Sequence, residues 1–120
     1  MEVKALESGP LERLFNGSAL AQILDFLTTF REWDYSKSDI AKNSGVSFRT
    51  ALSLLEKLEA LGLIKQTRRV GRAQMYRLDL ENEAAKALVA LTHELAMIEA
   101  KQMVKEELAK AEVPPISTGS

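Results

Sequence analysis

Cysteine is absent from this chain of 120 residues, which excludes a disulfide framework, a thiolate metal site and a cysteine nucleophile. Histidine occurs once, as His93, and a metal site needs several converging ligands. The sequence has no phosphate-cradling glycine loop, no Ser/His/Asp arrangement and no paired carboxylates at catalytic spacing. These absences predict a protein that is not an enzyme and that has no catalytic residue, bound metal or cofactor.

Long apolar runs are also missing. The N-terminus, Met1-Glu2-Val3-Lys4, lacks the apolar run of a signal peptide, so none is expected. Charged residues interrupt even the most apolar stretch, residues 84–100, so no membrane span is expected. With 46% hydrophobic and 28% charged residues, the composition is that of an ordinary globular protein. The sequence therefore predicts a cytoplasmic protein without a membrane partner.

The chain lacks a net positive charge, but one segment of it is basic. The net charge of the chain is −1. Residues 34–79 hold nine Lys and Arg against five Asp and Glu, a net of +4, whereas residues 1–33 carry −2 and residues 80–120 carry −3. Because nucleic-acid binding needs a local basic surface and not a basic protein, this middle segment is the candidate for it.

The segment from Tyr35 onwards has the pattern of two short helices joined by a tight turn. Ser36 and Ser47 each stand where a side chain can cap the first turn of a helix. Asn43-Ser44-Gly45 ends the first helix, and Val46 fills the corner before the second. Apolar residues at helical spacing give the second helix a core-facing side, made of Ala51, Leu54, Leu55, Leu58 and Leu61.

A two-stranded hairpin is expected after Gly62. Its strands are residues 63–68 and 74–78, and Gly71 supplies the positive φ that a tight turn needs. Of its apolar side chains, Ile64, Met75 and Leu78 are expected to reach the core. Three arginines, Arg68, Arg69 and Arg72, are expected at or near the tip of the hairpin.

Helices are expected on both sides of this segment. Residues 11–15 form a short apolar turn over the core, residues 19–33 form the first core helix, and Trp33 and Tyr35 form an aromatic lid. A helix over residues 82–110 would be about 43 Å long, which exceeds the width of a small domain. One apolar seam along it is Ala84, Leu88, Leu91, Leu95 and Ile98, and a second stripe is Val89, Ala96, Ala100 and Met103. Two apolar sides predict two neighbours, the parent domain and a second copy of the chain.

Several short pieces of residues 11–78 follow one another in a familiar order. They are residues 16–27, Asp39-Ile40-Ala41, Gly45-Val46-Ser47, Leu55-Glu56-Lys57-Leu58-Glu59 and Leu61-Gly62-Leu63-Ile64. Together they resemble the winged helix-turn-helix of archaeal and bacterial transcription regulators of the ArsR/MarR-like type. The resemblance implies a mainly α fold with a small β-hairpin wing. The domains would be 1–80 for binding DNA, 81–112 for dimerisation and 113–120 as a disordered tail.

The resemblance also implies a function, namely sequence-specific binding of double-stranded DNA by a homodimer that regulates transcription. Arg49, in the first turn of the second helix, would contact guanine. The other expected DNA-binding residues are Lys37, Lys42, Ser47, Phe48, Thr50, Ser53, Arg68, Arg69 and Arg72. The expected dimer interface is Leu88, Leu91, Leu95 and Ile98. The sequence marks no small-molecule effector.

Phe48 and Leu52 leave two other functions open. They lie four residues apart on one helix, where this family often has polar or basic residues, and they can touch thymine methyl groups or pack on a protein. If they pack on a protein, the chain is a winged-helix adaptor in a protein assembly. A third alternative is a protein that binds RNA, or DNA without sequence preference.

Overall fold

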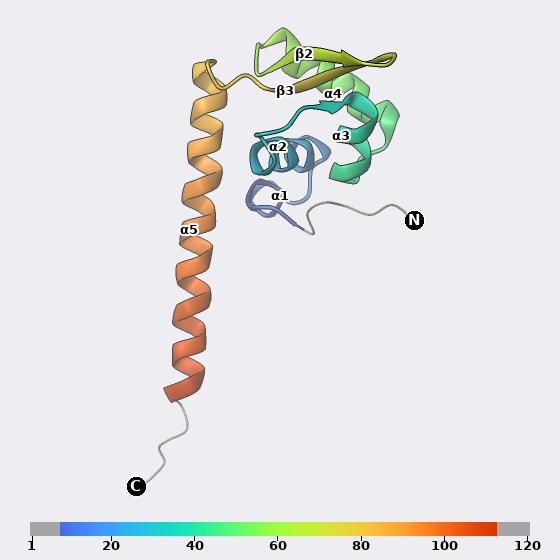
Figure 1. Cartoon of the computed structure of the whole chain (residues 1–120). Helices are drawn as coiled ribbons and strands as arrows, with labels where there is room; N and C mark the ends of the chain where they lie inside the picture. The colour runs from blue at the N-terminus through green and yellow to red at the C-terminus, as the bar shows by residue number, and fades with distance from the viewer. Residues whose placement is uncertain (1–7, 113–120) are drawn as a thin grey trace, which may run out of the picture.

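The computed structural model describes residues 8–112, in which a small domain is followed by one long helix that runs along the domain and past it (Figure 1). This arrangement confirms the predicted fold class, and the predicted tail, residues 113–120, lies outside the described part. The elements are α1 (Pro10–Leu14), α2 (Ala19–Thr29), β1 (Tyr35–Ser36), α3 (Lys37–Ser44), α4 (Phe48–Ala60), β2 (Ile64–Val70), β3 (Ala73–Leu78) and α5 (Glu83–Glu112).

The helices α3 and α4 begin and end where their capping residues predict. The Ser36 hydroxyl accepts a hydrogen bond from the backbone N–H of Asp39 at 3.1 Å. Helix α3 ends at Gly45, whose φ of 75° is the left-handed conformation that glycine tolerates. Val46, which is 5% exposed, fills the corner between the two helices. These local contacts fix the turn between α3 and α4.

The sheet has three antiparallel strands in the order β1-β3-β2, one more than the predicted hairpin. Strand β1 has two residues, too few for a recognisable pattern, and pairs with Met75 and Tyr76 of β3. The hairpin strands are longer than predicted, so only Gly71, with a φ of 63°, and Arg72 form the turn. Of the three wing arginines, Arg72 is therefore at the tip, whereas Arg68 and Arg69 belong to strand β2.

The core lies between the helices α2, α3 and α4 and the sheet, and the first turn of α5 closes it. Tyr76 faces this core and Met75 does not, contrary to the sequence-based expectation. Because side chains alternate along a strand and Leu78 is buried, the residue two before it is the one that points inward. The buried cluster is Ile23, Phe26, Leu27, Ile40, Ala41, Val46, Ala51, Leu55, Leu58, Ile64, Tyr76, Leu78 and Ala85.

Three apolar expectations at the ends of helices are wrong. Helix α2 ends at Thr29, so Trp33 lies outside it and is 66% exposed; Tyr35 alone covers the core, with its ring 4.7 Å from that of Phe26. Leu61 is 62% exposed because α4 ends one residue before it and the chain turns away. Near α1, Leu11 is buried, but Leu14 and Phe15 are more than half exposed.

One asparagine links the start of helix α5 to the end of the α4 segment. The Asn82 carboxamide oxygen accepts hydrogen bonds from the N–H groups of Ala84 and Ala85, which caps α5. Its amide nitrogen donates to the Gly62 carbonyl, just after α4, at 2.8 Å. The end of the α4 segment and the start of α5 therefore share one side chain.

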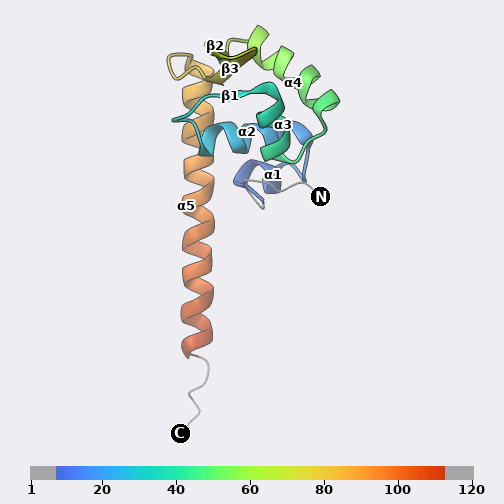
Figure 2. The same ribbon diagram turned by 45° about the vertical axis from the view of Figure 1, so that its right-hand side comes forward.

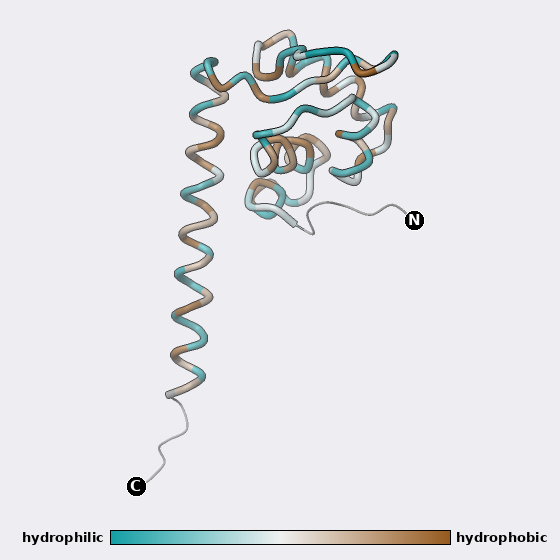
Figure 3. The backbone as a smooth tube through the Cα atoms, viewed as in Figure 1, coloured by the Kyte–Doolittle hydropathy of each residue, from teal (hydrophilic) through white to brown (hydrophobic). Residues whose placement is uncertain are grey.

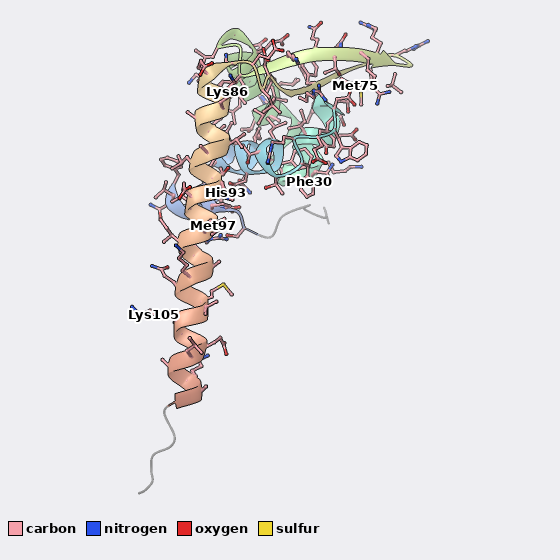
Figure 4. All side chains as sticks on the ribbon, turned by 60° about the vertical axis from the view of Figure 1, so that its left-hand side comes forward. Phe30, Met75, Lys86, His93, Met97 and Lys105 are labelled. Atoms are coloured by element: carbon pink, nitrogen blue, oxygen red, sulfur yellow. The ribbon has the colours of Figure 1, made fainter. Side chains whose placement is uncertain are left out.

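The second half of α5 extends beyond the domain. In Figure 4, Lys105 lies on this part of the helix, and residues 101–111 are all exposed. Figure 3 shows apolar segments recurring along α5 well past the domain. Arg13 of α1 pairs with Glu99, near the point where the domain ends.

Asp25, a buried carboxylate on α2, holds the start of α1. It is 1% exposed, and its two oxygens accept hydrogen bonds from the backbone N–H groups of Leu11, at 2.9 Å, and Glu12, at 2.8 Å. Burial raises the pKa of this carboxyl, and the two hydrogen bonds oppose that rise. The carboxylate thus satisfies amide groups that α1 cannot satisfy by itself.

The substitution Asp25→Ala should therefore destabilise the protein. We expect the free energy of unfolding to fall by about 2 kcal/mol, because one buried amide loses its partner and a second loses a charged acceptor. Denaturant unfolding measures the change. The matched control, Glu32→Ala, removes an exposed carboxylate and should stay within about 0.5 kcal/mol. Equal losses for the two variants would contradict this role of Asp25.

Candidate nucleic-acid interface

The outer side of α4 is one half of the candidate interface. Ala51, Leu55 and Leu58 hold the helix on the core, which turns the opposite side to solvent. The exposed residues at its front are Ser47, Phe48, Arg49, Thr50, Leu52 and Ser53. Figure 1 shows this end of α4 and the tip of the β2–β3 hairpin on the side of the domain away from α5, and Figure 2 shows the same end of α4 on that side.

Two of the short polar residues in this set are occupied by the helix cap. The Ser47 hydroxyl accepts from the backbone N–H of Thr50 at 3.2 Å and lies 3.0 Å from the Thr50 hydroxyl. Ser53 and Arg49 lie further round the exposed side. Ser47 and Thr50 therefore fix the backbone at the start of α4. Among the residues predicted to contact bases, Arg49 is the long hydrogen-bond donor that is exposed there.

The wing arginines divide into two kinds. Arg68 is held by Asp34, the residue before β1: its Nε and Nη2 donate to the two carboxylate oxygens at 2.9 and 3.1 Å. The Thr67 hydroxyl donates to the same carboxylate at 2.6 Å. This clamp joins strand β2 to the chain that enters β1, on the other side of β3, and fixes the base of the wing.

The Asp34 carboxylate is charged near neutral pH. Its hydrogen bonds from Arg68 and Thr67 lower its pKa to about 2. Because the pKa in the folded state is lowered, the clamp stabilises the fold above the usual value of 3.8 and is lost as the pH falls through about 2. The wing clamp should therefore be insensitive to pH near neutrality.

Arg69 and Arg72 are the exposed arginines of the wing that have no carboxylate partner within residues 8–112. Arg69 Nη1 lies 3.5 Å from the Arg72 carbonyl, which is at the limit of a hydrogen bond, so it is held only weakly. The Gln74 side chain donates to the Arg68 carbonyl at 3.0 Å and stiffens the strand pair behind the tip. Two guanidinium groups on a braced hairpin can approach a polyanion together.

The two lysines of α3 also differ in whether they contact another residue of the protein. Lys42, in its last turn, is exposed. Lys37 is half-buried, and its ammonium lies 5.1 Å from the centre of the Tyr76 ring, at cation–π distance. Of the sequence-predicted cations, Lys42, Arg49, Arg69 and Arg72 face solvent without a carboxylate partner among the described residues. Arg68 is also exposed but is paired with Asp34, and Lys37 is half-buried over the Tyr76 ring.

Sequence reasoning missed the residues that hold these cations. Asp34 and Arg68 are 34 positions apart, and Lys37 meets Tyr76 only because β1 pairs with β3. No local pattern marks such partners. Asp34, an acidic residue in a basic segment, was the one feature of the sequence that indicated an ion pair. It did not indicate which arginine would pair with it.

The part of the chain that the structure describes has neither a metal-binding cluster nor a membrane-spanning helix. Within residues 8–112, no three His, Asp or Glu side chains gather closely enough to hold a metal ion. Nor is any helix of that range long and apolar enough to cross a membrane.

Known structures provide the comparison for this geometry, since no protein-family model and no curated protein sequence matches the chain. MepR of Staphylococcus aureus, a transcription regulator of the multidrug efflux pump MepA, aligns with a TM-score of 0.58 and 20% identity over 87% of this chain and 82% of its own. An apo form of a ZitR variant from Lactococcus lactis gives 0.56 and 20% over 79% and 73%.

A third similar structure is a homodimeric winged helix-turn-helix DNA-binding domain of Mb0332 from Mycobacterium bovis, a possible ArsR-family transcriptional regulator. It aligns with a TM-score of 0.52 and 27% identity over 78% of this chain and 81% of that one. The chain has the winged helix-turn-helix fold of these transcription regulators.

Proposed function

We propose that this protein is a transcription regulator that binds double-stranded DNA sequence-specifically as a homodimer. The observation that carries the proposal is the pairing of an exposed first turn of α4, with Arg49, and a braced wing bearing Arg69 and Arg72 on the side of the domain away from α5. Structures of a MepR variant bound to an oligodeoxyribonucleotide and of ZitR in complex with DNA support this use of the fold.

Each exposed cation has a role in the proposal. Arg49 forms the bidentate contact with guanine in the major groove, beside Ser53. Lys42 contacts a phosphate, and Arg69 and Arg72 bind the backbone or the adjacent minor groove. The other four predicted residues contact phosphates only at the margin, because Ser47 and Thr50 form the cap of α4, Arg68 pairs with Asp34 and Lys37 lies over Tyr76.

The wing arginines provide a test within one element. Arg72→Ala should reduce the magnitude of the salt dependence of binding by about 0.9 per protomer, because one phosphate contact is lost. Arg68→Ala should leave this slope nearly unchanged, since Asp34 already neutralises that guanidinium. Fluorescence anisotropy at several salt concentrations measures both. Equal salt slopes for the two variants would show that pairing with Asp34 does not keep Arg68 from contacting phosphate.

Dimerisation through α5 is the second part of the proposal. Leu88 and Leu91 line an apolar groove of about 440 Å³ between α1, α2 and α5, and Leu95 and Ile98 continue the same side of the helix. Leu91 is 42% and Ile98 is 52% exposed in the single chain. A second copy would cover these side chains, and the homodimeric state of the Mb0332 domain agrees with that arrangement. The dimer would place two reading helices about 34 Å apart.

Selection of bound sequences from a random duplex pool tests the function directly. A regulator of this kind should yield a near-palindromic motif with two half-sites separated by about one helical turn. A pool that binds without enrichment would instead indicate an architectural or non-specific protein. No binding at micromolar protein and low salt would overturn the proposal.

A protein-interaction adaptor is the second candidate, and Phe48, which is 51% exposed, is the observation that favours it. Replacing Arg49, Arg69 and Arg72 with Ala separates the two functions. The triple variant should lose DNA under the first, whereas an adaptor would keep its partner.

A further inference from the structure

Two apolar side chains stand on the otherwise polar outer side of α4. Phe48 is 51% exposed and Leu52 is 37% exposed. Four residues apart on a helix, they are neighbours, and at 3.6 residues per turn Arg49 and Ser53 lie beside them on the same outer side. They therefore belong to the surface that the proposed function turns toward the major groove.

We propose that Phe48 and Leu52 read the C5 methyl group of thymine. The inference rests on the proposed function and adds the base chemistry that the reading helix selects. Thymine is the base of ordinary DNA that presents an apolar group in the major groove, where side chains such as Phe contact it. Arg49 then selects guanine and the apolar pair selects a nearby thymine, so each half-site should contain both bases.

The charges around the pair favour DNA over a second copy of the chain as its occupant. Residues 34–79 carry a net charge of +4, and Lys42, Arg69 and Arg72 are exposed on the neighbouring elements. Two copies of this surface would bring like charges together, which costs binding energy. A DNA duplex offers phosphates to the cations and methyl groups to the apolar pair at the same time.

Replacing thymine with uracil tests this reading, because the two bases differ only in the C5 methyl group. The probes are the best duplex from the random-pool selection and the same duplex with uracil in place of every thymine. The wild-type protein should bind the uracil duplex roughly fourfold more weakly for each methyl group contacted, the factor expected for burying one methyl-sized group. Fluorescence anisotropy at fixed salt measures the ratio.

The variant Phe48→Ala/Leu52→Ala should bind the two duplexes equally. Both side chains are exposed, so the variant should fold, and its thermal unfolding checks this. The matched control is Leu61→Ala, which removes another exposed leucine, at the far end of α4, and should keep the wild-type preference for thymine. Any effect of uracil on the shape of the duplex would persist in the double variant, which separates it from a lost contact.

Each result has a distinct meaning. Equal binding of the two duplexes by the wild-type protein would overturn the thymine inference and leave the proposed function intact. A double variant that keeps the full preference for thymine would also overturn it and would favour a protein partner for the pair. Failure to bind any duplex would overturn the inference and the proposed function together.

Discussion

Raising the salt concentration from about 50 to about 200 mM should weaken binding to duplex DNA by about four orders of magnitude. Each protomer would then contact about four phosphates, one through each of Lys42, Arg49, Arg69 and Arg72. A dimer then neutralises about eight phosphates and gives a log–log slope near −7. The cause is the release of counterions from the duplex.

An anisotropy titration at several salt concentrations measures this slope. Potassium glutamate and potassium chloride should give slopes of the same order, because the cation release is common to both. A slope near zero would show that the basic surface does not meet phosphates, and the adaptor function would then be the better account. The expected size of the effect also means that affinities are comparable only at one salt concentration.

The variant Leu91→Glu/Ile98→Glu should turn the dimer into a monomer. Each substitution would place a carboxylate against apolar side chains of the second copy, and burying an unpaired charge costs several kcal/mol. Analytical ultracentrifugation should show the monomer mass. Because one protomer contacts only half of the phosphates, the salt slope should also fall to about half of the wild-type value.

A matched control moves the same two charges by one position. Ala90→Glu/Met97→Glu places both carboxylates about 100° around the helix from the proposed seam, on exposed positions. This variant should remain dimeric and keep the wild-type slope. If it dissociates and Leu91→Glu/Ile98→Glu does not, the interface lies on a different side of α5.

The elements that could be predicted are those that local chemistry determines. Ser36, Gly45 and Ser47 act on residues within one turn of themselves, so their caps are visible in the sequence. The long uninterrupted helix was predicted for the same reason, since it needs only the absence of glycine and proline after Asn82. The exposed side of α4 followed from the spacing of its buried residues.

The elements that could not be predicted depend on contacts between distant segments. Strand β1 exists because β3 offers it an edge, and that pairing also places Tyr76 under Lys37. The Asp34–Arg68 clamp and the Asp25 cap of α1 join residues on different elements. Sequence reasoning therefore named the candidate cations, but it could not tell which arginine pairs with Asp34.

The shared side chain of Asn82 has a consequence for how a dimer would measure DNA. One carboxamide contacts the chain leaving the reading helix and the first turn of the long helix, so the tilt between them depends on that junction. In such a dimer, the Asn82 junction would set the separation of the two half-sites, and the first turn of α4 would set the bases contacted within each. In the proposed dimer, substitutions at this junction could change the spacing of the half-sites without changing the bases that Arg49 and its neighbours would contact.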